Sequence, residues 1–164
     1  MMLRVGILTV SDRSSRGERE DASGPALAHL IQAEGWSVIK QAVLPDDESA
    51  IRDMLISWSD SAELDVILTT GGTGFAPRDV TPEATRAVIE RESSGLAEAM
   101  RAASLKITPH AMLSRIVTGI RKKTLIINLP GSPKAAVENL QVVIPVLSHA
   151  IQLLSEDPAS ESTH

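Results

Sequence analysis

The chain has 164 residues, 43% of them hydrophobic, which is enough for one domain with a sizeable core. Only Trp36, Trp58 and Phe75 are aromatic, so we expect an aliphatic core and no base-stacking platform for single-stranded nucleic acid. The formal net charge of −5 argues against nucleic acid and anionic membranes as partners, because the whole-molecule field repels both.

The chain has no cysteine, which excludes disulfides, thiolate zinc sites and a cysteine nucleophile. Its four histidines lie far apart and do not have the spacing of metal ligands. The first residues lead directly into a strand-like run without a signal-type apolar region, and no apolar stretch approaches the length of a membrane span. These features predict a cytoplasmic protein.

Apolar runs and helical periodicity alternate along the chain, and together they predict an α/β fold. We expect a three-layer sandwich with a mainly parallel sheet and helices on both faces. Residues 1–155 form the expected domain, and residues 156–164 form a polar tail that we expect to be disordered. The expected strands are Leu3–Val10, Trp36–Leu44, Asp65–Leu68 and Thr124–Leu129, and the expected helices are Ser23–Glu34, Glu48–Ser57, Pro82–Arg91, Gly95–Leu105, His110–Val117 and a long helix that ends near Leu154.

The stretch Leu68–Pro82 joins a buried strand to a helix and has the composition of a ligand-binding loop. Its glycines, Gly71, Gly72 and Gly74, permit positive φ and close approach of the backbone to a phosphate, and Thr69, Thr70 and Thr73 add uncharged hydroxyl groups. Arg78 and Asp79 then place a cation beside a carboxylate. We expect Thr81 to be the N-cap of the next helix.

Two further strand ends carry polar loops. Asp46 and Asp47 precede a helix, and either of them is suited to cap it, so a functional role for Asp46 and a capping role are both open. The loop Pro130–Lys134 opens the long helix, where free N–H groups and the helix dipole favour a phosphate. The polar segment Ser14–Asp21 is expected to be a mobile surface loop or a lid over a ligand.

In a parallel sheet the carboxyl ends of the strands share one edge. The loops at Ser11-Asp12, Pro45-Asp46, Gly71–Asp79 and Pro130–Lys134 should therefore meet there. The sequence thus predicts one composite anion-binding cleft that contains several carboxylates.

Three motifs resemble those of the molybdopterin adenylyltransferases of molybdenum-cofactor biosynthesis, whose relatives include the gephyrin and plant Cnx G domains. They are Ser11-Asp12-Arg13, the run Thr69–Thr85 and Leu129-Pro-Gly-Ser-Pro-Lys134. The resemblance covers nearly the whole chain, with one departure at Ser132, where relatives often have Asn or Gln.

The resemblance implies Mg²⁺-dependent transfer of AMP from ATP to the terminal phosphate of molybdopterin, with release of pyrophosphate. It makes Asp46 and Asp79 the catalytic carboxylates and the candidate Mg²⁺ ligands. Together with the loop chemistry, it predicts a binding site for ATP and molybdopterin made of Ser11, Asp12, Gly71, Gly72, Thr73, Gly74, Arg78, Ser104, Ser114, Pro130, Gly131, Ser132 and Lys134.

The resemblance also implies a homotrimer, and contacts with the enzymes before and after this step are expected. The segment after Gly95 is apolar, and some of it is expected to face another subunit; its apolar residues include Leu96, Met100, Leu105, Ile107 and Met112. Two alternatives remain at this stage: a molybdopterin-binding protein of the same fold without adenylyl transfer, and a trimeric scaffold domain.

Overall fold

The computed structural model describes residues 1–156, so residues 157–164 of the predicted tail lie outside it. The strands are β1 (Arg4–Val10), β2 (Ser37–Leu44), β3 (Val66–Thr70), β4 (Arg91–Glu92), β5 (Thr118–Arg121) and β6 (Thr124–Leu129). The helices are α1 (Asp12–Ser15), α2 (Ser23–Ala33), α3 (Glu48–Asp60), α4 (Thr81–Val88), α5 (Ser94–Leu105), the 3-10 helix η1 (Pro109–Leu113) and α6 (Pro133–Leu154).

The six strands form one sheet in the order β2-β1-β3-β6-β5-β4. Strands β2, β1, β3 and β6 are parallel to one another. Strand β5 pairs with β6, and β4 with β5, in antiparallel orientation. The chain leaves β1 toward β2 on one side and returns to β3 on the other. The carboxyl ends of β1 and β3 therefore mark the switch point of the sheet, where α/β folds bind ligands.

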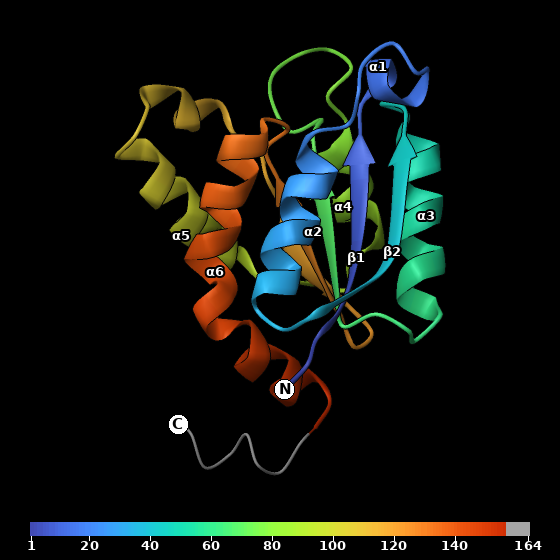
Figure 1. Cartoon of the computed structure of the whole chain (residues 1–164), viewed down its shortest axis with the longest axis vertical. Helices are drawn as coiled ribbons and strands as arrows, with labels where there is room; N and C mark the ends of the chain where they lie inside the picture. Colours follow the sequence, from blue (N-terminus) through green and yellow to red (C-terminus); the bar gives the residue numbers. More distant parts are fainter. Residues whose placement is uncertain (157–164) are drawn as a thin grey trace.

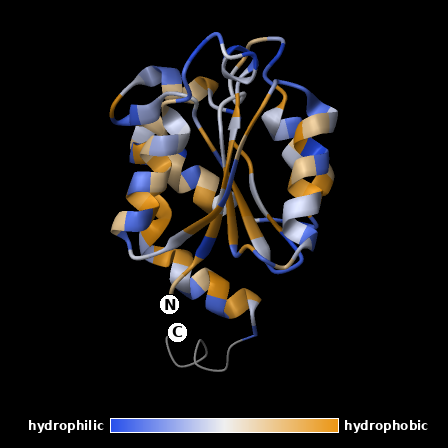
Figure 2. Cartoon of the chain, turned by 45° about the vertical axis from the view of Figure 1, so that its right-hand side comes forward, coloured by the Kyte–Doolittle hydropathy of each residue, from blue (hydrophilic) through white to orange (hydrophobic). Residues whose placement is uncertain are grey.

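Two helical layers cover the sheet, as Figures 1 and 2 show, and the predicted three-layer architecture is confirmed. Helices α2, α5 and α6 pack on one face against strand residues such as Leu68 and Ile127. Helices α3 and α4 pack on the other face against the neighbouring residues Ile67 and Ile126. All four strand residues are buried, as expected of strands covered on both faces.

A buried asparagine joins three of these elements. Asn128 on β6 is completely buried, and its Nδ2 donates hydrogen bonds of 2.9 Å to the hydroxyl groups of Thr69 on β3 and Thr85 on α4. Its Oδ1 accepts a 3.0 Å hydrogen bond from the N–H of Val117. Because every polar group of this side chain has a partner, the network fixes α4 against the sheet at little cost.

The structure corrects several expected boundaries. Helix α4 ends at Val88 rather than Arg91, because residues 91–92 form the short strand β4, and its N-cap is Val80 rather than Thr81. The expected helix His110–Val117 is a 3-10 turn that ends at Leu113. The strand β5 was not predicted, since it has only four residues, one of them a glycine.

Helix α6 contradicts the expectation that no apolar stretch approaches the length of a membrane span. Within residues 1–156 it is the one helix long and apolar enough by length and composition to cross a membrane, with a mean hydropathy of 1.3. In the structure its inner face, including Leu140 and Leu147, is buried against the sheet. This packing is sufficient to explain the apolar face.

Candidate active site

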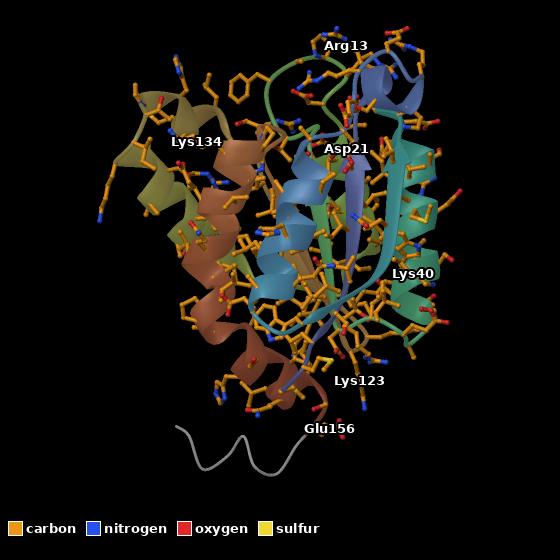
Figure 3. All side chains as sticks on the ribbon, viewed as in Figure 1. Arg13, Asp21, Lys40, Lys123, Lys134 and Glu156 are labelled. Carbon is orange, nitrogen blue, oxygen red and sulfur yellow. The ribbon has the colours of Figure 1, made fainter. Side chains whose placement is uncertain are left out.

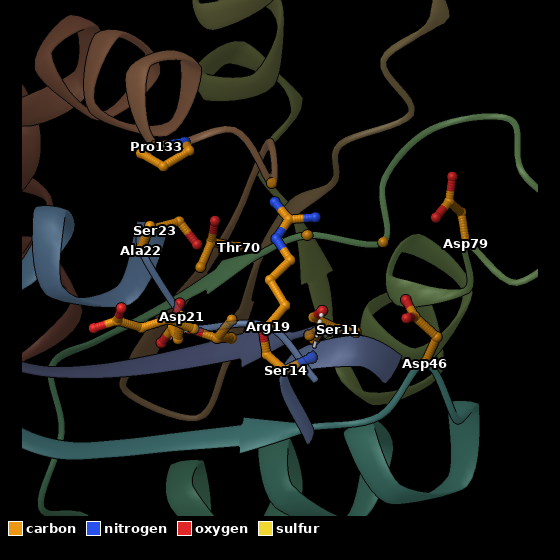
Figure 4. Close-up of a pocket in the computed structure, with 16 residues that line it drawn as sticks. Ser11, Ser14, Arg19, Asp21, Ala22, Ser23, Asp46, Thr70, Asp79 and Pro133 are labelled. Carbon is orange, nitrogen blue, oxygen red and sulfur yellow. Dashed lines mark hydrogen bonds between the residues drawn. The ribbon is translucent and has the colours of Figure 1, made fainter. Parts of the chain in front are cut away.

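A cleft with a volume of about 320 Å³ lies at the switch point, between the ends of β1 and β3. The polar strand-end loops meet there, as predicted, and Figure 4 shows their side chains around the cavity. The predicted site residues that line the cleft are Ser11, Asp46, Gly71, Gly72, Asp79 and Gly131.

An arginine–aspartate pair joins the central loop to the end of β1. Arg78 donates two hydrogen bonds to the carboxylate of Asp12, at 2.6 Å from Nε and 2.9 Å from an Nη atom. This contact lowers the pKa of Asp12 to about 2. Arg78 also donates to the carbonyl group of Asp46 at 3.0 Å, so it connects three loops.

Asp12 and Asp46 form a reciprocal pair between the ends of β1 and β2. The N–H of Asp12 donates to the Asp46 carboxylate at 2.9 Å, and the N–H of Asp46 donates to the Asp12 carboxylate at 3.0 Å. The pKa of Asp46 is raised, chiefly by burial and further by the negative charges of Asp12 and Asp79. The N–H of Asp12 and the positive charge of Arg78 lower the pKa of Asp46 and offset only part of this effect.

The neighbouring aspartate performs the capping role. The side chain of Asp47 accepts a 3.1 Å hydrogen bond from the N–H of Ser49 at the start of α3. Asp46 makes no such contact and points into the cleft (Figure 4). The structure therefore separates the two roles that the sequence left open.

The glycine-rich loop adopts backbone conformations that require glycine. Gly71 has φ +104° and Gly72 has φ +67°. A Cβ atom on Gly71 would collide with the carbonyl group of Val10, and one on Gly72 would collide with the hydroxyl group of Thr81. That hydroxyl group donates to the carbonyl of Gly71 at 3.0 Å, so Thr81 fixes the loop instead of capping α4.

Three consecutive N–H groups of this loop are available to a ligand. Within residues 1–156 the N–H groups of Gly72, Thr73 and Gly74 have no hydrogen-bond acceptor. Successive unpaired N–H groups in such a turn form a concave site that attracts anions. The loop therefore offers backbone donors beside the carboxylates of the cleft.

Arg115 holds the opposite side of this loop. Its backbone N–H donates to the carbonyl of Thr73, and its guanidinium donates to the carbonyls of Gly74 at 2.7 Å and Asp79 at 2.8 Å. An ion pair with Glu83 at 2.7 Å anchors the same guanidinium to α4. Arg115 is therefore a positioning residue for the loop.

A second pocket of about 270 Å³ lies on the other side of the same loop. Its lining includes five predicted site residues, Thr73, Gly74, Ser104, Ser114 and Pro130. The lining is mostly apolar, with contributions from Ile107 and Leu113. The hydroxyl oxygen of Ser114 is buried there and has no hydrogen-bond partner among the described residues.

Four predicted site residues line neither pocket. Asp12 and Arg78 are paired with each other, and Ser132 is the N-cap of α6, where its hydroxyl oxygen accepts from the N–H of Ala135 at 3.4 Å. The side chain of Lys134 is 83% exposed, with Glu138 at 3.9 Å, and Figure 3 shows it apart from Asp21 in the cleft. The contact of Lys134 with a phosphate therefore stays a prediction.

Two threonines of the loop also have other roles than the predicted ones. Both are buried: the hydroxyl of Thr69 accepts from Asn128, and the hydroxyl of Thr70, which lines the cleft, donates to the carbonyl of Pro130. Conversely, Arg19 and Asp21 line the cleft although neither was among the predicted site residues. The only sequence signal was their position in the polar segment after β1.

The fold and this site define an α/β protein with an anion-binding cleft at the switch point of its sheet. Residues 6–149 match the family described as "Probable molybdopterin binding domain", and the chain belongs to this family.

Individual relatives agree with this assignment. A molybdopterin adenylyltransferase of Helicobacter pylori strain J99 is 41% identical over 93% of this chain and 88% of its own length. Gephyrin of Dictyostelium discoideum is 46% identical over 95% of this chain, which spans only 23% of that relative. A solved structure, the molybdopterin biosynthesis enzyme MoaB of Thermus thermophilus, is 52% identical with a TM-score of 0.90, covering 96% of this chain and 99% of that one.

The environments of Asp46 and Asp47 predict opposite effects on stability. A carboxyl group whose folded-state pKa is raised stabilises the fold below its unfolded pKa, about 3.9, and this contribution is lost as pH rises through the folded-state pKa. Asp46→Asn should therefore equal or exceed the wild type in urea unfolding at pH 7, since the amide oxygen still accepts from Asp12. Asp47→Ala should lose about 1 kcal/mol.

Urea titrations at pH 7 and pH 4 test this pair. The stability advantage of Asp46→Asn over the wild type should be smaller at pH 4 than at pH 7. Asp47→Ala should be less stable than the wild type at pH 7. A marked loss of stability in Asp46→Asn at pH 7 would show that the aspartate is a structural residue.

The loop geometry predicts a specific cost at Gly72. Gly72→Ala and Gly35→Ala both place a side chain at positive φ, which costs about 1–2 kcal/mol. Only at Gly72 does the new Cβ meet Thr81 and approach Asp46 Oδ1 to 3.0 Å, whereas nothing lies within 4 Å at Gly35. Gly72→Ala should lose about 1–3 kcal/mol more in urea unfolding. Equal losses in the two variants would contradict the tight packing of the loop.

Proposed function

We propose that the cleft and the second pocket together catalyse adenylyl transfer from ATP to molybdopterin. The terminal phosphate oxygen of molybdopterin attacks the α-phosphorus of ATP, the bond to the β-phosphate oxygen breaks, and pyrophosphate leaves. The product is adenylyl-molybdopterin. The relative from Helicobacter pylori, a molybdopterin adenylyltransferase by name, supports the proposal because its match covers most of both chains.

The observation that carries the proposal is the juxtaposition of backbone donors and carboxylates. The N–H groups of Gly72–Gly74 are unpaired within the described residues, and Asp46 and Asp79 line the cleft beside them. Phosphoryl transfer requires positioning of the phosphates and neutralisation of their charge more than covalent chemistry. The N–H groups hold phosphate oxygens, while Thr81 binds the carbonyl groups of Gly71 and Gly72 and the N–H of Arg115 binds that of Thr73.

The carboxylates fit a Mg²⁺ ion that arrives with the nucleotide. No group of three or more His, Cys, Asp or Glu side chains in residues 1–156 is arranged to hold a metal by itself. Mg²⁺ in nucleotide sites usually takes one or two carboxylates plus phosphate oxygens, which matches Asp46 and Asp79. When bound, the ion would supply positive charge to the phosphate oxygens and to Asp46, whose pKa is raised chiefly by burial.

The second pocket suits the pterin. Its apolar lining matches a flat ring system, and buried polar groups such as the Ser114 hydroxyl suit the ring's hydrogen-bonding edge. The loop residues Thr73 and Gly74 line this pocket, while Gly71 and Gly72 line the cleft. A phosphate attached to the pterin would therefore reach the cleft across the loop.

Turnover measurements on carboxylate variants test the proposed reaction. With ATP, Mg²⁺ and molybdopterin, mass spectrometry should detect adenylyl-molybdopterin, and chelation of Mg²⁺ should abolish it. Asp79→Asn and Asp46→Asn should each lower turnover by about 100-fold or more, because charge stabilisation at the transferring phosphate is lost. The matched control, Asp47→Ala, should keep the wild-type rate.

The alternatives give different results. Molybdopterin binding without any adenylylated product would indicate a binding protein of the same family. Activity of Asp79→Asn within a few-fold of the wild type would remove Asp79 from the mechanism.

We also propose that the protein forms a homotrimer. Among the residues considered for the interface, Met100 is fully buried in the chain's own core and is excluded, and Leu96 is partly buried against that core. Leu105, Ile107 and Met112 remain 43%, 62% and 66% exposed. They lie around the end of α5 and η1, at the periphery of the fold (Figure 1).

A three-fold assembly would cover this apolar surface with a different patch of the next subunit. Light scattering at micromolar concentration should give three times the chain mass of 17.5 kDa, or a multiple of that trimer. Ile107→Glu combined with Met112→Glu should lower the mass to that of the monomer, while the same charges at the exposed Gln32 and Gln41 should not. A monomeric wild type would contradict the proposal.

A further inference from the structure

Residues 12–21 form a strap beside the cleft. Ser11 caps α1 at its start, and the N–H of Glu18 donates to the carbonyl of Arg13 at 3.0 Å. At its end, the Asp21 carboxylate accepts from the Thr9 hydroxyl at 2.9 Å and from the N–H of Gly24 at 3.1 Å. The strap is therefore attached at both ends rather than being a free loop.

Arg19 lies between these two attachments and lines the cleft. Figure 4 shows its side chain extending into the pocket from the strap. Within residues 1–156 its guanidinium has no hydrogen bond or ion pair, whereas the guanidinium groups of Arg78 and Arg115 are both bound to carboxylates and carbonyls. Arg19 is thus a cation at the cleft with its hydrogen-bonding capacity unused.

The other charged residues of the cleft are all acidic: Glu20, Asp21, Asp46 and Asp79. A nucleoside triphosphate would add further negative charge to this surface. Arginine binds phosphate through a planar fork of donors, and Arg19 is the one cationic side chain that lines the cleft in the described part of the chain. The protein's net charge of −5 offers no general attraction in its place.

We propose that Arg19 binds the β- and γ-phosphates of ATP and the pyrophosphate that they become. This inference rests on the proposed adenylyl transfer. In an in-line displacement the leaving group departs on the side opposite to the attacking oxygen. The second pocket, assigned to the pterin, lies beyond Gly74 and Pro130, whereas Arg19 reaches into the cleft on the other side of that loop.

The assignment predicts an effect that increases with the number of phosphates. Isothermal titration calorimetry in the presence of Mg²⁺ should compare ATP, ADP, AMP and inorganic pyrophosphate. Arg19→Gln should weaken ATP and pyrophosphate binding by about ten-fold or more, because a charge-assisted phosphate contact is lost, and should change AMP binding by less than about two-fold. Arg19→Lys should recover part of the loss.

Arg13→Gln is the matched control, since it removes the same charge from the strap at a side chain that does not line the cleft. Equal losses for AMP and ATP in Arg19→Gln, or the same losses in Arg13→Gln, would overturn the assignment. Urea unfolding of Arg19→Gln checks that the fold is kept, and Arg19→Lys provides a second variant if it is not. A wild type that binds no nucleotide would instead overturn the proposed function itself.

Discussion

The cleft depends on the orientation of the peptide groups in the glycine-rich loop, which Thr81 and Arg115 hold between them. A peptide group presents either its N–H or its carbonyl to a ligand, and phosphate is attracted to the first and repelled by the second. By donating to the carbonyls of Thr73, Gly74 and Asp79, Arg115 directs these oxygens away from the cleft. The positive φ of Gly71 and Gly72 makes this orientation possible without side-chain collisions.

The charged side chains at the cleft differ in whether they are paired with an opposite charge. Asp12 and Arg78 neutralise each other and join the loops after β1, β2 and β3, so this ion pair has a structural role. Asp46 accepts from the N–H of Asp12, and its pKa is raised by burial and, to a smaller extent, by the negative charges of Asp12 and Asp79. Within the described residues, the cleft therefore combines acidic side chains with one cationic side chain, Arg19, and with the free N–H groups of the glycine-rich loop.

Much of this architecture was predictable from the sequence. The parallel strands have uninterrupted apolar runs, and their polar loops follow at the ends, so the α/β fold and the cleft edge could be inferred. Individual roles could not, because they depend on contacts distant in the chain. Asp46 and Asp47 both match the capping pattern in the sequence. The structure shows that Asp47 caps α3, whereas the Asp46 carboxylate accepts from the N–H of Asp12, 34 residues earlier in the chain.

Contacts distant in sequence also explain why Arg115 and Arg19 were not singled out. Arg115 acts on a loop 36 to 42 residues earlier in the chain, and no local pattern reports such a contact. Arg19 lies in a polar segment whose composition is typical of a solvated loop, and its place at the cleft follows from the attachment of Asp21 to Thr9.

The glycine-rich loop lies between the two pockets and contributes residues to both. A loop that contributes Gly72 to one pocket and Gly74 to the other can hold a phosphate between two substrates, which is the arrangement that in-line transfer requires.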